Sequence, residues 1–301
     1  MKVNYKAHAA VLGANFFFGA AVSAVKYISP SVIQPYAINV VRVLTALPLF
    51  WLLFAFKPGK IGIQKKHIPL FLVCALTGVA VNQLLFIKGL SLTSPIHGSL
   101  LSLVTPIAIT VIAVFLAKEK ITTNKIIGFI LGISGALTLV LSKNLSDKAA
   151  DIITGDILII INALSYSFYL VLVKPLMQLY TPLHVIRWVF TFGTLMILPF
   201  GWYDFIHTDW SLFNGYHFFA LGFCALGATF FAYLFNVYGI AHLGSSVVGY
   251  YIYTQPIFAS TIAIVLFNEK LSAAKMIAAL LIFAGVYLVN QKNKLAITVE
   301  E

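Results

Sequence analysis

The chain alternates between long apolar runs and short polar stretches, and this pattern predicts helices that cross a membrane. A helix of about 20 apolar residues spans the roughly 30 Å hydrocarbon core of a bilayer. The runs that are long enough lie at 8–28, 35–56, 68–90, 96–117, 124–142, 153–173, 182–200, 216–238, 246–267 and 273–290. The sequence therefore predicts an all-α integral membrane protein with ten transmembrane helices.

The second half of the pattern repeats the first. With a shift of 150 residues, 74–140 aligns without a gap on 224–290, and 16 of the 67 positions are identical. The matches that apolar composition does not explain are Pro106 with Pro256, Glu119 with Glu269, Lys125 with Lys275 and Gly135 with Gly285. A repeat of this length indicates a duplicated unit. We expect two five-helix repeats, one over residues 1–145 and one over residues 146–301.

The first apolar run has a second interpretation. Lys2 and Lys6 precede it and small residues occupy positions 21–24, which is also the pattern of a cleaved signal peptide. Removal of this run would leave the first repeat one helix shorter than the second. We therefore expect the run to be retained as the first transmembrane helix.

The distribution of lysine predicts how the chain crosses the membrane. Loops on the cytoplasmic side carry an excess of Lys and Arg. Alternate loops hold twelve lysines on the side of the N-terminus and six on the other side, which predicts cytoplasmic termini. Because each repeat has an odd number of helices, the second would cross upside down relative to the first. Inverted repeats are typical of alternating-access carriers, with the substrate near the midplane between the repeats.

Composition narrows the possible partners. Hydrophobic residues make up 60% of the chain and charged residues 10%. The net charge of +11 would suit a nucleic-acid partner, but the lysines lie in short loops, where membrane orientation explains them. The two cysteines form no metal or disulfide motif, and the ATP-binding pattern GxxxxGK[ST] is missing. We expect no cofactor, and as partners the lipid bilayer, here the plasma (inner) membrane, and a small-molecule substrate.

Each repeat ends in a proline-centred run, a Glu-Lys turn and a glycine-bearing run. These read Val104-Thr105-Pro106, Glu119-Lys120, Gly128 and Gly135 in the first half, and Thr254-Gln255-Pro256, Glu269-Lys270 and Gly285 in the second. With ten runs in about 300 residues, the chain resembles the drug/metabolite transporter superfamily, and within it the EamA-like family. The resemblance covers nearly the whole chain, although Ala278 replaces Gly128 and Gln255 replaces Thr105. It implies a 5+5 helical bundle around a central cavity that passes small metabolites, often outward, and it does not choose the substrate.

Pro106 and Pro256 fall at the centres of their runs. A proline removes one backbone donor and frees the carbonyl four residues back, here on Ser102 and Ile252. Backbone groups at membrane depth are tolerated only where protein or a water-filled cavity satisfies them. We predict that both prolines are hinges in a cavity wall, and a packing kink is the alternative.

The only two arginines, Arg42 and Arg187, lie inside the second and seventh runs. Ionisable groups at that depth tend to face a cavity or a partner. The planar guanidinium suits a carboxylate or a phosphate, which predicts anion contact. The alternative is that each arginine reaches the nearest interface or bonds carbonyls at a helix end.

Other polar side chains recur at helical spacing within the apolar runs. Such a stripe lines a hydrated path or joins helices through interhelical hydrogen bonds. Those that we assign to a substrate cavity, beside the arginines, are Asn15, Gln83, Ser99, Ser102, Asn162, Tyr166, Tyr233, Tyr250 and Tyr253. A tyrosine near the end of a run also suits the aromatic belt at the membrane surface.

Acidic residues are placed at the ends of the runs or outside them. Glu119 and Glu269 follow the fourth and ninth runs, where each caps a helix end or gates the cavity. Asp156 reaches deepest among the acids, near the start of the sixth run. Ion-driven carriers usually keep a carboxylate within the bundle. The sequence thus favours facilitated flux or exchange, with coupling through His97, His184 or His242 left open.

These features favour a secondary transporter, an exporter or exchanger of small metabolites such as amino acids or related organic anions. A channel or a receptor-like membrane protein is the alternative. An integral membrane enzyme would need clustered acid, base or metal groups, such as HExxH, and the sequence contains none. We therefore do not expect an enzyme.

Overall fold

Short polar side chains and prolines set where many of the helices begin. Asn4, Ser94, Asp151 and Thr181 each precede a helix and accept a hydrogen bond from the amide three residues on. Such caps satisfy backbone donors that the first helical turn leaves unpaired. Proline follows two of these caps in the first turn, where its missing N–H is not needed.

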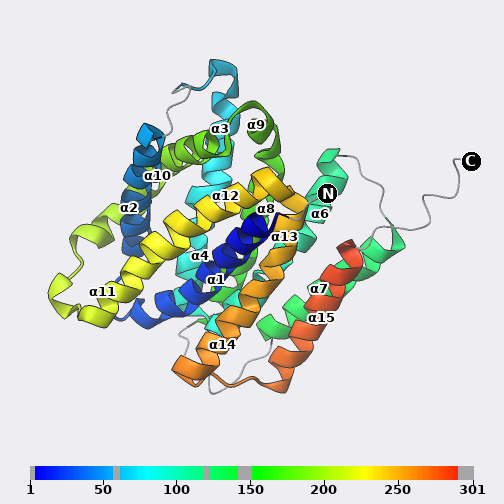
Figure 1. The fold of residues 1–301 in the computed structure, drawn as a ribbon. Coiled ribbons are helices and arrows are strands. Elements are labelled where there is room, and N and C mark those ends of the chain that lie inside the picture. The colour runs from blue at the N-terminus through cyan, green and yellow to red at the C-terminus, as the bar shows by residue number, and fades with distance from the viewer. Residues whose placement is uncertain (1–3, 57–61, 118–121, 142–150, 291–301) are drawn as a thin grey trace, which may run out of the picture.

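The computed structural model describes residues 4–56, 62–117, 122–141 and 151–290, and it confirms the all-helical class (Figure 1). The elements of the first half are α1 (Tyr5–Ile28), α2 (Pro35–Phe56), a 3₁₀ turn (Lys65–His67), α3 (Ile68–Ala75), a π-helical segment (Leu76–Ala80), α4 (Val81–Leu92), α5 (Pro95–Leu101), α6 (Val104–Ala117) and α7 (Thr123–Leu141). α3, the π segment and α4 form one continuous rod.

The second half is broken at equivalent places. Its elements are α8 (Ile152–Leu172), α9 (Lys174–Leu179), α10 (Pro182–Ile206), a 3₁₀ turn (Trp210–Leu212), α11 (Gly215–Gly222), a π-helical segment (Phe223–Phe231), α12 (Ala232–Leu243), α13 (Ser245–Tyr251), a 3₁₀ turn (Ile252–Thr254), α14 (Gln255–Phe267) and α15 (Ala273–Asn290). A shift of 150 residues places the first π segment on the second, and the α5–α6 break on the α13–α14 break.

Nine helical stretches in the described residues are long and apolar enough to cross a membrane, and they coincide with the first nine predicted runs. The tenth run forms α15, whose apolar part, Ala273–Val289, is shorter. Several boundaries differ from those predicted. The sixth stretch continues beyond position 173 to Leu179, because α9 restarts with a proline in its first turn. The seventh extends to Ile206 and the eighth to Leu243.

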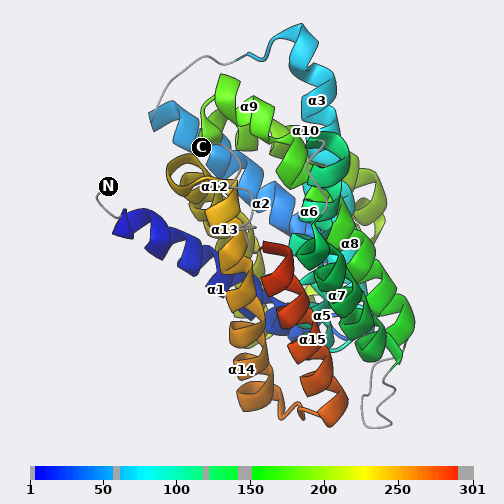
Figure 2. The same ribbon diagram turned by 90° about the vertical axis from the view of Figure 1, so that its right-hand side faces the viewer.

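The two halves are packed into each other. α1 lies against α12 and α14, α2 against α10, α4 against α8, and α7 against α15, so each of these contacts joins the first half to the second. Figures 1 and 2 both show α7 and α15 side by side at one edge of the bundle. There a Cβ on Gly128 would lie 2.5 Å from the carbonyl oxygen of Gly285, so only glycine permits this approach.

Candidate substrate cavity

A cavity lies between the two halves, at the level of the helix breaks. Its empty volume is about 1090 Å³, counting the mouth that opens to solvent. Its wall is built by α1, α2, α4, α5, α8, α12 and α13, together with residues of the breaks and of the second π segment. We call this space the central cavity. Its lining reaches Ile240 and Val248, at the end of the bundle where α12 stops and α13 begins.

Arg42 is the only charged residue among the described residues that line the central cavity. Its side chain is 6% exposed, and its Nε donates to the Thr229 hydroxyl at 2.8 Å. Nη1 lies 3.5 Å from the Asn39 side-chain oxygen, at the limit of a hydrogen bond. No described carboxylate contacts this guanidinium, so the wall presents one buried cation without an acidic partner in the described part of the chain.

Amide side chains form a second group of polar contacts on the wall. The Gln255 side-chain amide donates to the Asn15 side-chain oxygen at 2.7 Å, and Asn15 in turn donates to the Val11 carbonyl at 2.7 Å. Asn236 donates to the Tyr166 hydroxyl at 3.1 Å. These bonds hold the amides in place, and the wall can bind polar solute groups as well as apolar ones.

The breaks in the fourth and ninth spans both contribute to the wall. Ser102 lies in the α5–α6 break and Thr105 in the first turn of α6, while Ile252 lies in the α13–α14 break and Gln255 begins α14. Neither Pro106 nor Pro256 itself lines the cavity. The carbonyl that each proline frees is also not left open. The amide of the residue just before the proline bonds it in a 3₁₀ turn, Thr105 to Ser102 at 3.1 Å, and Gln255 to Ile252.

The structure brings most of the predicted cavity residues together. Eight of them line the central cavity: Asn15, Arg42, Gln83, Ser99, Ser102, Asn162, Tyr166 and Tyr233. Gln83 and Tyr233 occupy matching positions in the two halves and are both buried. The hydroxyls of Ser99 and Ser102 donate to carbonyls within their own helix, which leaves them as acceptors toward the cavity.

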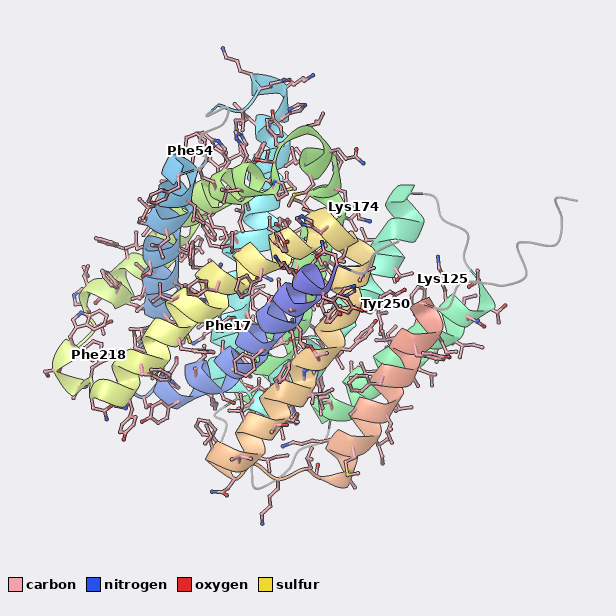
Figure 3. The ribbon with its side chains drawn as sticks, in the orientation of Figure 1. Phe17, Phe54, Lys125, Lys174, Phe218 and Tyr250 are labelled. Carbon is pink, nitrogen blue, oxygen red and sulfur yellow. The ribbon has the colours of Figure 1, made fainter. Side chains whose placement is uncertain are left out.

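Arg187 does not line the central cavity. It is fully buried between α2 and α10, with its guanidinium carbon 3.8 Å from the Phe54 ring centroid and 4.5 Å from that of Trp51. Nη2 lies 3.1 Å from the His184 Nδ1. Figure 3 shows Phe54 near the end of α2, well away from Tyr250 on α13. The aromatic faces stabilise this cation.

The two remaining tyrosines of the predicted site also lie outside the lining. Tyr250 is 45% exposed, and its ring centroid lies 6.5 Å from that of Tyr253. Tyr253 packs on Phe283 of α15, at 6.4 Å between ring centroids. Their neighbours Gly249 and Ile252 line the cavity instead, because the helix turns these tyrosines away from it.

Of the two glutamates predicted at helix ends, the structure describes one. Glu119 lies outside the described residues. Glu269 accepts hydrogen bonds from the Ser94 hydroxyl at 2.7 Å and from Lys275 Nζ at 3.0 Å, and its second oxygen lies 3.4 Å from the Ile96 amide. It therefore ties the N-terminus of α5, in the first half, to the end of α14 in the second.

The sequence does not single out two polar features of the structure. Thr105 and Gln255 both line the cavity, and their matching positions in the two repeats are the signal that could have found them. Outside the cavity lining, His97 and Asp156 are joined in a buried hydrogen bond of 2.9 Å. Nothing in their spacing of 59 residues indicates this contact. No group of three or more potential metal ligands occurs in the described residues.

Comparison with known proteins agrees with this architecture. The chain is 24% identical over 252 residues to the uncharacterized transporter YetK of Bacillus subtilis, covering 83% of this chain and 76% of the relative. An uncharacterized transporter of Archaeoglobus fulgidus is 26% identical over 266 residues, 87% of this chain and 89% of its own. The protein WALLS ARE THIN 1 of Arabidopsis thaliana is 26% identical over 286 residues, 83% and 72% of the two chains.

A solved crystal structure superposes with a TM-score of 0.64 at 16% identity, covering 96% of this chain and 97% of its own, which supports the fold alone. Two of these relatives are named as transporters, which implies transport rather than catalysis. The model of the EamA-like transporter family matches the chain twice, over residues 5–141 and 153–291. This multi-pass membrane protein therefore belongs to the EamA-like transporter family, within the drug/metabolite transporter superfamily.

Proposed function

We propose that this protein is a secondary transporter, an exporter or exchanger, of small metabolites such as amino acids or related organic anions. The observation that carries the substrate class is Arg42. A buried cation that faces a cavity, and has no acidic partner among the described residues, favours an anionic solute. The carboxylate of the substrate would complete the guanidinium's hydrogen bonds, while Phe18 and Phe86 on the wall contact its apolar part.

The mechanism that we propose is alternating access between two inverted five-helix repeats, 1–145 and 146–301, with ten transmembrane helices in all. The double match to the family model and the equivalent helix breaks support a duplicated unit. The odd number of spans per repeat and the lysine distribution support inversion and cytoplasmic termini. The membrane that we propose is the plasma (inner) membrane. The spans that contain Pro106 and Pro256 would bend at their breaks, and Glu269 would help to hold one end closed.

Transport by purified protein in liposomes tests this proposal. Labelled amino acids and organic anions are presented with the same unlabelled compound inside the vesicles or without it. A carrier gives saturable flux that internal substrate accelerates. Flux that neither saturates nor responds to internal substrate would favour a channel, and binding without flux would favour a receptor.

The two arginines supply a matched pair of variants. Arg42→Gln removes one partner of a buried charged contact, which typically costs about 2 kcal/mol or more, so the half-saturating substrate concentration should rise at least about thirtyfold. Arg42→Lys keeps the charge without the planar fork and should lie between. Arg187→Gln should leave this concentration unchanged within about twofold. Equal effects of Arg42→Gln and Arg187→Gln would remove the basis for anion recognition at Arg42.

A further inference from the structure

A buried carboxylate–histidine pair links the two halves at the end of the bundle opposite the turn between α12 and α13. Asp156 lies in the first turns of α8, and His97 lies in α5; both side chains are completely buried. The Thr93 hydroxyl donates to one carboxylate oxygen, and His97 Nδ1 lies 2.9 Å from the other. Both oxygens of Asp156 are therefore bonded, and both bonds come from the first half of the chain.

The pair lies between the central cavity and this end of the bundle, which faces the outside in the orientation proposed above. We call it the outer end. Ile87 is the last residue of α4 that lines the cavity, and Thr93 follows it by six residues, or about 9 Å of helix. Next to the pair, a Cβ on Gly155 would lie 2.8 Å from the Gly89 carbonyl oxygen, so α4 and α8 touch through their backbones.

The other charged groups of the outer end in the described residues form no hydrogen bond or ion pair with Asp156 or His97. Glu269, after α14, pairs with Lys275 of α15 at 3.0 Å. Lys26 of α1 donates to the Ser91 carbonyl at 3.2 Å, Lys88 of α4 is half-buried, and Asp151, the exposed cap of α8, bonds Thr154. Among the described residues, His97 is the one basic side chain in contact with Asp156.

Because no other described basic side chain contacts Asp156, the net charge of the Asp156–His97 pair is set by whether the pair carries one additional proton. With aspartate ionised and histidine neutral, the pair buries one negative charge, which is unfavourable. One more proton makes the pair neutral. It can bind at His97 Nε2, which has no hydrogen-bond partner among the described residues, so its addition breaks no hydrogen bond there. Burial therefore favours the pair with the extra proton.

We propose that Asp156 and His97 form a proton-binding site that links closure of the outer end to the pH outside. When this end opens, water hydrates both groups, so an unneutralised charge on the pair no longer carries the cost of burial. When it closes, the pair takes up a proton from the outer solution. An acidic outer solution would thus favour the closed outer end, and an alkaline one would favour opening, by up to about tenfold per pH unit for one proton.

Cys224 provides a readout that needs no knowledge of the substrate. It lines the central cavity, and Cys74→Ser leaves it as the single thiol of the chain. A membrane-impermeant cationic methanethiosulfonate, added to the outer face of intact vesicles, reaches Cys224 only when the outer end opens. The rate of modification is measured between about pH 6 and 8.5. Because thiolate chemistry alone accelerates this reaction with pH, the excess slope over a variant without the pair reports the proposed site.

Asp156→Asn and His97→Gln, each in the Cys74→Ser background, should lose the excess slope. His97→Gln leaves the carboxylate bonded to Thr93, so it carries the test where Asp156→Asn folds poorly. Asp209→Asn is the matched control on the same side of the membrane. Hydrogen bonds from the Ser211 hydroxyl and amide hold the pKa of the exposed Asp209 below its usual value, so it stays ionised throughout, and its replacement should keep the wild-type slope.

The inference rests on the proposed function, because it requires an outer end that opens. Labelling of Cys224 with the same slope in wild type, Asp156→Asn and His97→Gln would overturn the proton site and leave alternating access intact. Failure to label Cys224 from the outer face at any pH would overturn both. Loss of the excess slope in the two pair variants, with retention in Asp209→Asn, is the expected result.

Discussion

The surroundings of Arg42 and Arg187 differ more than their sequence contexts do. Both arginines follow a proline by a few residues near the start of an apolar helix, and both are buried. Arg42 is held by the Thr229 hydroxyl and faces the central cavity, whereas Arg187 lies over the rings of Trp51 and Phe54. A buried cation can therefore be a recognition group or a packing group, and the chemistry of its neighbours decides which.

The polar neighbours of Arg42 leave part of its guanidinium available to a solute, whereas the aromatic neighbours of Arg187 cover its guanidinium. Hydroxyl and amide oxygens satisfy part of the guanidinium and leave the rest for a solute. Aromatic faces cover the cation and exclude water, which strengthens the attraction to the ring. We therefore expect Arg42 to determine transport and Arg187 to determine stability, and the following substitutions test that division.

After Arg42→Gln itself, the largest effect on transport that we expect concerns the hydroxyl that positions Arg42. Thr229→Val removes the acceptor of the 2.8 Å bond from Nε, and a hydrogen bond to a charged group contributes about 1.5–3 kcal/mol. The half-saturating substrate concentration in the liposome exchange assay should rise at least about tenfold. Thr229→Ser should behave like wild type. In the Arg42→Gln background Thr229→Val should add little, and full additivity of the two would show that Thr229 acts independently of Arg42.

An intermediate effect, on the free energy of unfolding, is expected at Arg187, which lies over the rings of Trp51 and Phe54. Arg187→Gln removes a desolvated cation–π contact that contributes about 2 kcal/mol, and should lower the free energy of unfolding by about that amount. Thermal unfolding in detergent measures the loss, and Trp51→Leu combined with Arg187→Gln should give less than the sum of the single effects. Arg42→Gln serves as the comparison. A larger loss of stability at Arg42 than at Arg187 would reverse the division of roles.

The smallest effect, on the free energy of unfolding, is expected at Thr191, whose hydroxyl accepts a hydrogen bond from the Trp51 indole. Trp51 Nε1 donates to the Thr191 hydroxyl at 3.2 Å, and this hydroxyl donates to the Arg187 carbonyl at 2.8 Å. Thr191→Val should cost about 1 kcal/mol of stability through the loss of one neutral hydrogen bond to the ring. Thr191→Ser, which keeps the hydroxyl, should restore it. Reduced transport at unchanged stability in Thr191→Val would tie the Trp51 group to the cavity after all.

The sequence predicts the helices well because their apolar runs are set by the thickness of the bilayer. Eight of the polar residues that it assigns to a substrate cavity line the central cavity, because polar side chains in apolar helices tend to face a cavity or a partner. It does not say which way a side chain points around its helix. Tyr250 and Tyr253 belong to a polar stripe, yet their neighbours Gly249 and Ile252 line the cavity. Rotation about the helix axis follows from contacts between distant helices, which a single sequence does not record.

The sequence also does not show which residues of the first half contact which residues of the second half. His97 and Asp156 each look like a polar residue near a helix end, and only the packing of α5 and α8 makes them one site. The α9 extension shows the same limit at a local level. Loss of apolar character near position 173 predicts an end, whereas the helix resumes at Lys174 to pack on α8 and α10.

The glycine contact between α7 and α15 sets where motion would start. A Cβ on Gly128 would meet the Gly285 carbonyl oxygen at 2.5 Å and the Val289 side chain at 2.6 Å, so the two helix backbones lie in close contact. Such close packing would hinder the sliding of one helix along the other. In the proposed mechanism, the two halves would then rotate relative to each other about the contact between α7 and α15 at one edge of the bundle. The helices farthest from that edge would sweep the widest arc, which places the greatest opening on the side of α2 and α10.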